Sequence, residues 1–146
     1  MKEYFKELVI AGKIHAAGTD EPVINIEIAK EFINAGTNIL LIPAPYTIPH
    51  FNEEDFKKIS YYVWDYNQNR EIDKKVLIMS SIDTTSDKDT IHQIALAAKA
   101  NCTLLQHIGD AINDISLPEN IYTMGVAIRG VKWQTHQMSS SIIRNE

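Results

Sequence analysis

Four short apolar runs recur along the chain and constrain its fold more than any other feature. They cover residues 8–14, 38–42, 75–79 and 102–106. Each run is near-continuously apolar rather than alternating, which is typical of strands covered on both faces in a parallel sheet. Their starts lie 30, 37 and 27 residues apart, close to the roughly 30 residues that one β-α-β unit needs. We therefore predict one parallel sheet with its strands in sequence order and right-handed crossovers.

Helical patterns fill the intervals between these runs. Four helices are expected from apolar spacing and end signals: one ending at Gly36, one capped by Asn52, one opened by Asp87, and one that begins with the capping box Ser116–Glu119 and stops near Gly130. The sequence also allows a short final helix over 133–141. The predicted fold class is α/β: four β-α units with a parallel sheet, half of a (β/α)8 TIM barrel, in a single half-barrel domain of residues 1–146. A complete barrel needs roughly 200–250 residues.

Composition narrows the partners and the compartment. The net charge of −5 leaves no basic stripe for nucleic acid or an anionic membrane. No apolar run is long enough to cross a bilayer, and no secretory segment follows Met1. The single cysteine, Cys102, excludes an internal disulfide framework and is expected to be a small buried residue at a strand start. These features indicate a cytoplasmic protein.

Polar side chains gather where the predicted strands end, which is where ligands bind in parallel β/α folds. Lys13 and His15 lie two residues apart, so on a strand they point to the same face. Together they could bind a phosphate or carboxylate, or support base or Schiff-base chemistry. The alternative is a lysine that extends from the strand end into solvent.

The fourth strand runs into His107 and Asp110, which flank Gly109. These two side chains could orient one another, coordinate a divalent cation such as Mg²⁺ together with Asp83, or form an anion site with backbone N–H groups. A histidine with only a local hydrogen bond is the alternative. We predict Lys13, His15, His107 and Asp110 as catalytic residues. The predicted substrate-binding residues, which suit phosphate or hydroxyl contacts but also ordinary loops, are Ser80, Ser81, Asp83, Thr84, Gln106 and Gly109.

Several stretches resemble the C-terminal half of an uncharacterised bacterial TIM-barrel family, often labelled haloacid dehalogenase-like hydrolase or phosphoenolpyruvate phosphonomutase-related. The resemblance covers about residues 8–138 and rests on five stretches: 10–22, 38–45, 89–96, 105–111, and 118–121 together with 127–130. It implies a barrel whose second half begins near the start of this chain, and a hydrolase or lyase. The segment Ser81–Thr85 lacks the second Asp of the Asp-x-Asp motif that haloacid-dehalogenase phosphatases use.

The expected function is therefore that of a half-barrel enzyme acting on a small phosphorylated or carboxylated metabolite, with a non-catalytic binding or assembly subunit as the alternative. A half-barrel leaves two strand edges and one apolar sheet face, with residues such as Leu40, Leu77 and Leu105, without cover. We expect a homodimer or pairing with a separate N-terminal half. A third option is that the terminal helices fold across the face, with Trp133 as the plug.

Overall fold

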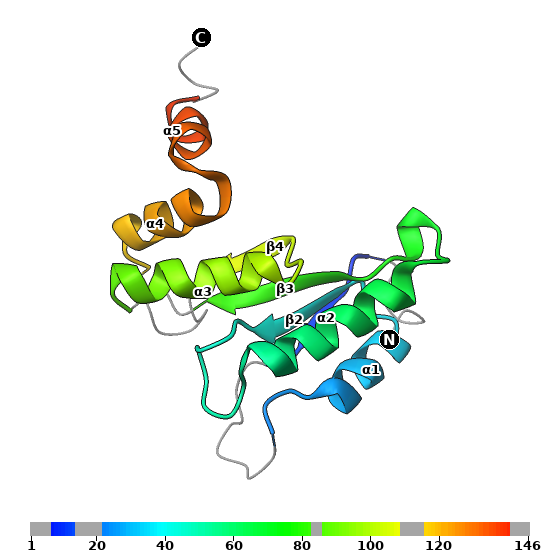
Figure 1. The fold of residues 1–146 in the computed structure, drawn as a ribbon. Helices are drawn as coiled ribbons and strands as arrows, with labels where there is room; N and C mark the ends of the chain where they lie inside the picture. Colours follow the sequence, from blue (N-terminus) through cyan, green and yellow to red (C-terminus); the bar gives the residue numbers. More distant parts are fainter. Residues whose placement is uncertain (1–6, 14–21, 83–85, 109–115, 141–146) are drawn as a thin grey trace.

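The computed structural model describes residues 7–13, 22–82, 86–108 and 116–140. In chain order its elements are β1 (Ile10–Gly12), α1 (Ile26–Asn34), β2 (Ile39–Pro43), α2 (Glu53–Asn67), the 3-10 helix η1 (Ile72–Lys74), β3 (Leu77–Ile82), α3 (Lys88–Ala100), β4 (Leu105–Ile108), α4 (Pro118–Arg129) and α5 (Val131–Ser139). The strands form one four-stranded parallel sheet in the order β1-β2-β3-β4 (Figure 1). The predicted α/β fold of four β-α units is confirmed, and it matches the units of a half-barrel.

The strands begin later than the apolar runs suggested. The run 75–79 begins two residues before β3, which starts at Leu77 and continues through Ser80 and Ser81 to Ile82. Cys102 lies in the turn before β4, exposed and with a φ of 60°. It is therefore not the buried strand residue that was expected. The turn ends α3 with Thr103 N–H donating to Ala98 O at 3.3 Å, the pattern of a helix terminated by a left-handed residue.

Side-chain caps start the first three helices. The side-chain oxygen of Asn25 accepts a hydrogen bond from Ile28 N–H at 2.8 Å, and Asn52 and Asp87 accept two backbone bonds each in the same way. The expected capping box of α4 is wrong. Leu117 is the cap residue and makes no side-chain bond, so Pro118 at the first position sets the start of this helix.

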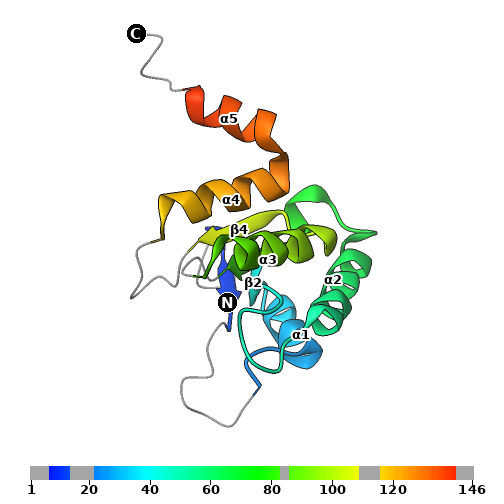
Figure 2. The same ribbon diagram turned by 60° about the vertical axis from the view of Figure 1, so that its left-hand side comes forward.

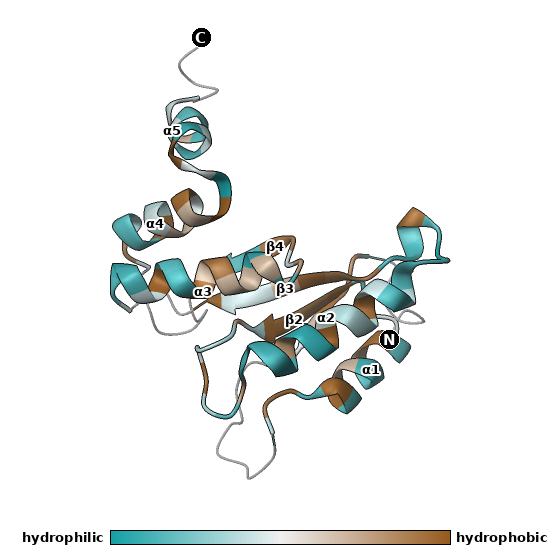
Figure 3. Cartoon of the chain, viewed as in Figure 1, coloured by the Kyte–Doolittle hydropathy of each residue, from teal (hydrophilic) through white to brown (hydrophobic). Residues whose placement is uncertain are grey.

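Two apolar clusters hold the helices on one face of the sheet. The larger joins Leu40, Ile42 and Ile78 of the sheet to Phe56 and Ile59 of α2 and to residues of α1. The smaller joins Ile82 to α3 and α4, through Ile91, Ile94, Ala95, Met124 and Ala127. Phe56 is completely buried, and truncating such a ring costs about 3–5 kcal/mol. Figure 3 shows the apolar colour along β2 and the first part of β3, and brown stretches between polar ones along the helices.

Alternation along the strands divides their side chains between two faces. Leu40, Ile42, Ile78 and Ser80 point toward α1, α2 and α3. The prediction that Leu40 lines the opposite face is therefore wrong, whereas Leu77 and Leu105 do lie there. No helix of the described ranges covers this opposite face (Figures 1 and 2). We call it the open face. It carries three rows of paired residues: Ile10-Ile39-Leu77, Gly12-Leu41-Met79-Leu105 and Pro43-Ser81-His107.

The side chains of the open face differ in how far they are exposed. Ile39 and Pro43 are buried, while Ile10 is 49% exposed and Leu41, Leu77, Met79 and Leu105 are half-buried. The last two helices do not cover it, because α4 packs on α3 and α5 continues outward from α4 (Figure 2). Trp133 on α5 is 58% exposed and stacks on His136. The expectation that Trp133 plugs the sheet is therefore wrong.

Helices α4 and α5 meet closely at Gly125. A Cβ atom at this position would lie 2.3 Å from the side-chain amide of Gln134, which is buried and accepts a hydrogen bond from Arg129 Nη1 at 3.1 Å. The chain then turns at Gly130, whose φ is 83°. Within the described residues, no helix combines the length and the apolar character that a bilayer crossing requires.

Candidate functional site

The carboxyl ends of the four strands form one edge of the sheet. Lys13 follows β1, the turn after Pro43 follows β2, and β3 and β4 end at Ile82 and Ile108. Five of the predicted site residues lie outside the described residues: His15, Asp83, Thr84, Gly109 and Asp110. The structure therefore places the other five, which are Lys13, Ser80, Ser81, Gln106 and His107.

Ser81 and His107 lie side by side on the open face. They are paired in the sheet register, and Ser81 Oγ is 3.3 Å from His107 Nδ1. Which of the two atoms donates depends on the tautomer of the imidazole ring. In either case Nδ1 is occupied by Ser81, so the serine holds the ring and leaves Nε2 for another partner. Both residues are half-buried. The pair therefore offers one oriented imidazole near the carboxyl edge of the sheet.

Ser80 and Gln106 also form a pair, but on the face toward the helices. Ser80 is completely buried, and its hydroxyl donates to Gln106 Oε1 at 2.5 Å. Because neighbouring residues of a strand point to opposite faces, this pair cannot share a pocket on the open face with Ser81 and His107. The predicted substrate-binding set is thus divided. Ser80 and Gln106 join β3 to β4 from the helix side.

Lys13 lies at the other edge of the sheet. Its Nζ donates to Pro22 O at 3.3 Å, across the connection from β1 to α1. Strands β1 and β4 are separated by β2 and β3, so a flat sheet would place their backbones about 14 Å apart. The structure therefore does not bring Lys13 and His107 into direct contact, and a shared site requires strong curvature or a ligand long enough to reach both.

Tyr46 is a candidate that the sequence reasoning missed. It follows β2 at the same edge of the sheet, is 58% exposed and has a φ of 69°, which is uncommon for a residue other than glycine. Its hydroxyl donates to Glu53 Oε1 at 2.8 Å. This hydrogen bond to the carboxylate raises the pKa of Tyr46 above its usual value. The phenol is therefore a hydrogen-bonding group rather than a base. The sequence places Tyr46 in the turn Pro43–Thr47 after β2, but no glycine or asparagine in this turn indicates that one of its residues has a positive φ.

Metal binding was predicted from Asp83, His107 and Asp110. Two of these residues lie outside the described ranges, and within those ranges no three His, Cys, Asp or Glu side chains gather closely enough to hold an ion. His107 is the one predicted ligand whose position is described, and its Nδ1 faces Ser81. The described part of the site is thus a histidine-serine pair.

A match to one protein family spans nearly the whole chain, including the strands and the site described above. A family model described as a domain of unknown function (DUF7916) matches residues 1–144. The chain belongs to this family. No curated protein and no solved structure matches it. The matched span of the DUF7916 domain includes all four strands and the Ser81-His107 pair, so both are features of a family member rather than of an appended segment.

Proposed function

We propose that this DUF7916 domain is the half-barrel form of a (β/α)8-barrel enzyme, a hydrolase or lyase, that acts on a small phosphorylated or carboxylated metabolite. The observation that carries the proposal is the Ser81-His107 pair, 3.3 Å apart on the face of the sheet that no described helix covers. In a barrel this face lines the interior, and side chains at the carboxyl ends of the strands carry the chemistry. The reaction class rests on the sequence resemblance to barrel hydrolases and phosphonomutase relatives.

The described residues divide into three roles. His107 acts as the acid or base through Nε2, because Ser81 occupies Nδ1 and fixes the ring. Lys13 supplies positive charge for the anionic group of the substrate from the end of β1. Ser80 and Gln106 are positioning residues, since their hydrogen bond holds the ends of β3 and β4 together from the other face. In the alternative role for the same residues, His107 and Asp110 would coordinate a divalent cation such as Mg²⁺ together with Asp83.

Lys13 and His107 stand at opposite edges of the sheet, so the proposed site is completed by assembly. A second copy of the chain, or a separate N-terminal half, would close the sheet into a barrel and bring the two edges around one substrate. The exposed apolar side chains on the edge strands favour this arrangement: Ile10 is 49% exposed and Ile108 is 38% exposed. The same side chains support the second candidate function, a binding or assembly subunit without catalysis.

An NMR titration of the full chain with inorganic phosphate, pyruvate and Mg²⁺ tests the proposal. We expect the amide signals of Lys13, Ser81 and His107 to shift first, and His107→Gln to weaken the binding of the anion by about tenfold. The matched control is His92→Gln, the same change at an exposed histidine on α3. Equal affinity in wild type and His107→Gln, or saturating ligand that shifts signals elsewhere only, would favour the assembly subunit instead.

A further inference from the structure

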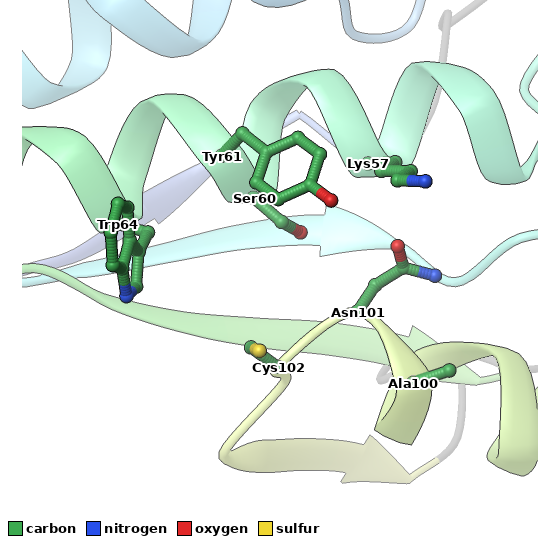
Figure 4. A pocket seen from close by; sticks show the side chains of 7 residues that line it. All are labelled: Lys57, Ser60, Tyr61, Trp64, Ala100, Asn101 and Cys102. Carbon is green, nitrogen blue, oxygen red and sulfur yellow. The ribbon is translucent and has the colours of Figure 1, made fainter.

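A cleft of about 210 Å³ lies between α2 and the turn that ends α3 (Figure 4). Four side chains of α2 face the end of α3 across it, and the main lining residues are Lys57, Ser60, Tyr61, Trp64, Asn101 and Cys102. Cys102 precedes β4, so the cleft lies toward the amino ends of the strands. It is therefore separate from the Ser81-His107 pair at the carboxyl edge.

Aromatic rings form much of the wall. Tyr61 and Trp64 are each 61% exposed, and Figure 4 shows the Trp64 ring at one end of the cleft with Tyr61 beside it. Lys57 lies toward the other end, with Nζ 5.6 Å from the centre of the Tyr61 ring. A cavity of about 150 Å³ lined by apolar side chains accommodates benzene. The cleft thus has the size and the walls for one small aromatic ring.

Ser60 gives the cleft a polar group that lacks a partner. The residue is 8% exposed, and its Oγ is buried with no hydrogen-bond partner among the described residues. In Figure 4 this oxygen points from α2 toward the turn at Asn101. A buried hydroxyl without a hydrogen bond is unfavourable, and a ligand atom that pairs with it removes this penalty. The unpaired hydroxyl therefore selects for a ligand that carries a hydrogen-bonding group.

Asn101 faces Ser60 from the opposite wall. Its Nδ2 donates to Ala97 O at 2.8 Å, which holds the side chain against the end of α3. Figure 4 shows its carboxamide oxygen turned toward α2. Because Ser60 Oγ is buried beneath the surface of the cleft, its side chain must rotate toward the cleft to meet a ligand; a ligand hydroxyl placed between the two walls can then accept a hydrogen bond from Ser60 and donate one to Asn101. This matches the one donor and the acceptor lone pairs of a phenol group.

We propose that this cleft is a binding site for a small phenolic ligand, with its ring against Trp64 and Tyr61 and its hydroxyl bonded to Ser60 Oγ. The ring covers exposed aromatic surface, and offset or edge-to-face contacts between rings add to the gain from apolar burial. The site does not depend on the proposed enzymatic function, because no residue of the cleft belongs to the carboxyl edge of the sheet.

The test compares phenol with toluene, a ligand of similar size without the hydroxyl. The full chain is titrated with each compound by NMR. We expect amide shifts at 57–64 and 100–102, and tighter binding of phenol. Ser60→Ala should reduce the affinity for phenol by about tenfold and leave that for toluene unchanged. The same variant should be at least as stable to urea as wild type, because it removes a buried hydroxyl that has no partner among the described residues.

Two further measurements keep the test decisive. Trp64→Leu, at an exposed position, should weaken both ligands, whereas Ser139→Ala on α5 should change neither. Bound phenol should also slow the alkylation of Cys102 by iodoacetamide, because Cys102 lines the cleft. The proposal is overturned if Ser60→Ala affects phenol and toluene equally. It is also overturned if Trp64→Leu binds both as wild type does, or if neither compound shifts the cleft signals up to its solubility limit.

Discussion

Asn67 and Val76 are joined by two hydrogen bonds between one side-chain amide and one backbone unit. Asn67 Nδ2 donates to Val76 O at 2.8 Å, and Val76 N–H donates to Asn67 Oδ1 at 2.9 Å. The last residue of α2 is thereby tied to the residue before β3, across the connection that contains η1. A similar link joins the starts of β1 and β2, where Val9 N–H donates to Asn38 Oδ1 at 3.1 Å. Two asparagines therefore fix where strands of the sheet begin.

Replacing Asn67 with alanine should destabilise the fold by about 2 kcal/mol, because two partly buried hydrogen bonds are lost at about 1 kcal/mol each. Urea unfolding followed by circular dichroism measures the change. Gln68→Ala is the matched control, since the Gln68 side chain makes only a long, exposed bond of 3.4 Å to Trp64 O. Equal losses for the two variants would show that the link to Val76 contributes nothing measurable.

Gly12 is the second position where local structure allows a sharp prediction. A Cβ atom there would lie 1.7 Å from Leu41 O, a backbone atom of the neighbouring strand. Gly12→Ala therefore forces β1 away from β2, and we expect a loss of about 2–3 kcal/mol with faster hydrogen exchange at the amides of β1.

The control for this prediction is Gly130→Ala. Gly130 has a φ of 83°, and an added methyl group would meet no atom within 4 Å. The cost of this change is therefore conformational only, on the order of 1–3 kcal/mol, because a φ of 83° with a ψ of 157° lies in a region that is essentially restricted to glycine. Its effect on β1 exchange should be nil. If Gly130→Ala exposes the β1 amides as much as Gly12→Ala does, the close approach to Leu41 is not the cause.

The sequence predicted the sheet better than it predicted the faces of the strands. Short apolar runs at β-α-β spacing are enough to predict parallel strands in order, and that prediction was confirmed. The same runs carry no alternation, so they cannot say which residues face the helices. Leu40 was for this reason assigned to the wrong face.

For the candidate site, too, the sequence predicted the position along the chain better than the face of the sheet. The strand ends were located, and Ser81 and His107 do lie together there. The neighbouring Ser80 and Gln106 turn to the other face, which a run of polar residues at a strand end does not reveal. Tyr46 was missed and Cys102 was wrongly placed in a strand, because both adopt a positive φ that glycine or asparagine usually takes. Tertiary context, rather than residue type, sets these conformations.

Asp87, the cap of α3, predicts a dependence of stability on pH. The hydroxyl of Thr90 donates to its Oδ2 at 2.6 Å, and Asp89 and Thr90 N–H donate to Oδ1. The bond from the Thr90 hydroxyl is the main reason that the pKa of Asp87 lies below its usual value. A carboxylate with a lowered folded-state pKa stabilises the fold above its unfolded-state pKa, and this contribution is lost as the pH falls through the lowered value.

Asp87→Asn should therefore reduce the acid-induced loss of stability, because asparagine still caps the helix but does not titrate in this range. Urea midpoints at pH 6 and pH 2.5 measure the difference. Thr90→Ala removes the strongest hydrogen bond, so it should move the pKa of Asp87, followed by the chemical shift of its side-chain carbon, toward the usual value. An Asp87 titration that is the same in wild type and Thr90→Ala contradicts this account.

The last prediction concerns assembly through the sheet. Burying apolar side chains of the open face and its edges contributes about 25 cal/mol for each Å² that a partner covers, and a specific interface covers roughly 1,200–2,000 Å² in total.

We expect the 16.5 kDa chain to sediment at about twice this mass at micromolar concentration. Ile10→Lys, on the exposed edge strand β1, should return it to the monomer mass. Ile72→Lys changes an 86% exposed isoleucine of η1 and should leave the mass unchanged. Circular dichroism is used to check that both variants fold. A wild-type chain that sediments as a monomer at these concentrations would show that the open face is not an interface between copies, and would leave a different polypeptide as the partner that completes the proposed barrel.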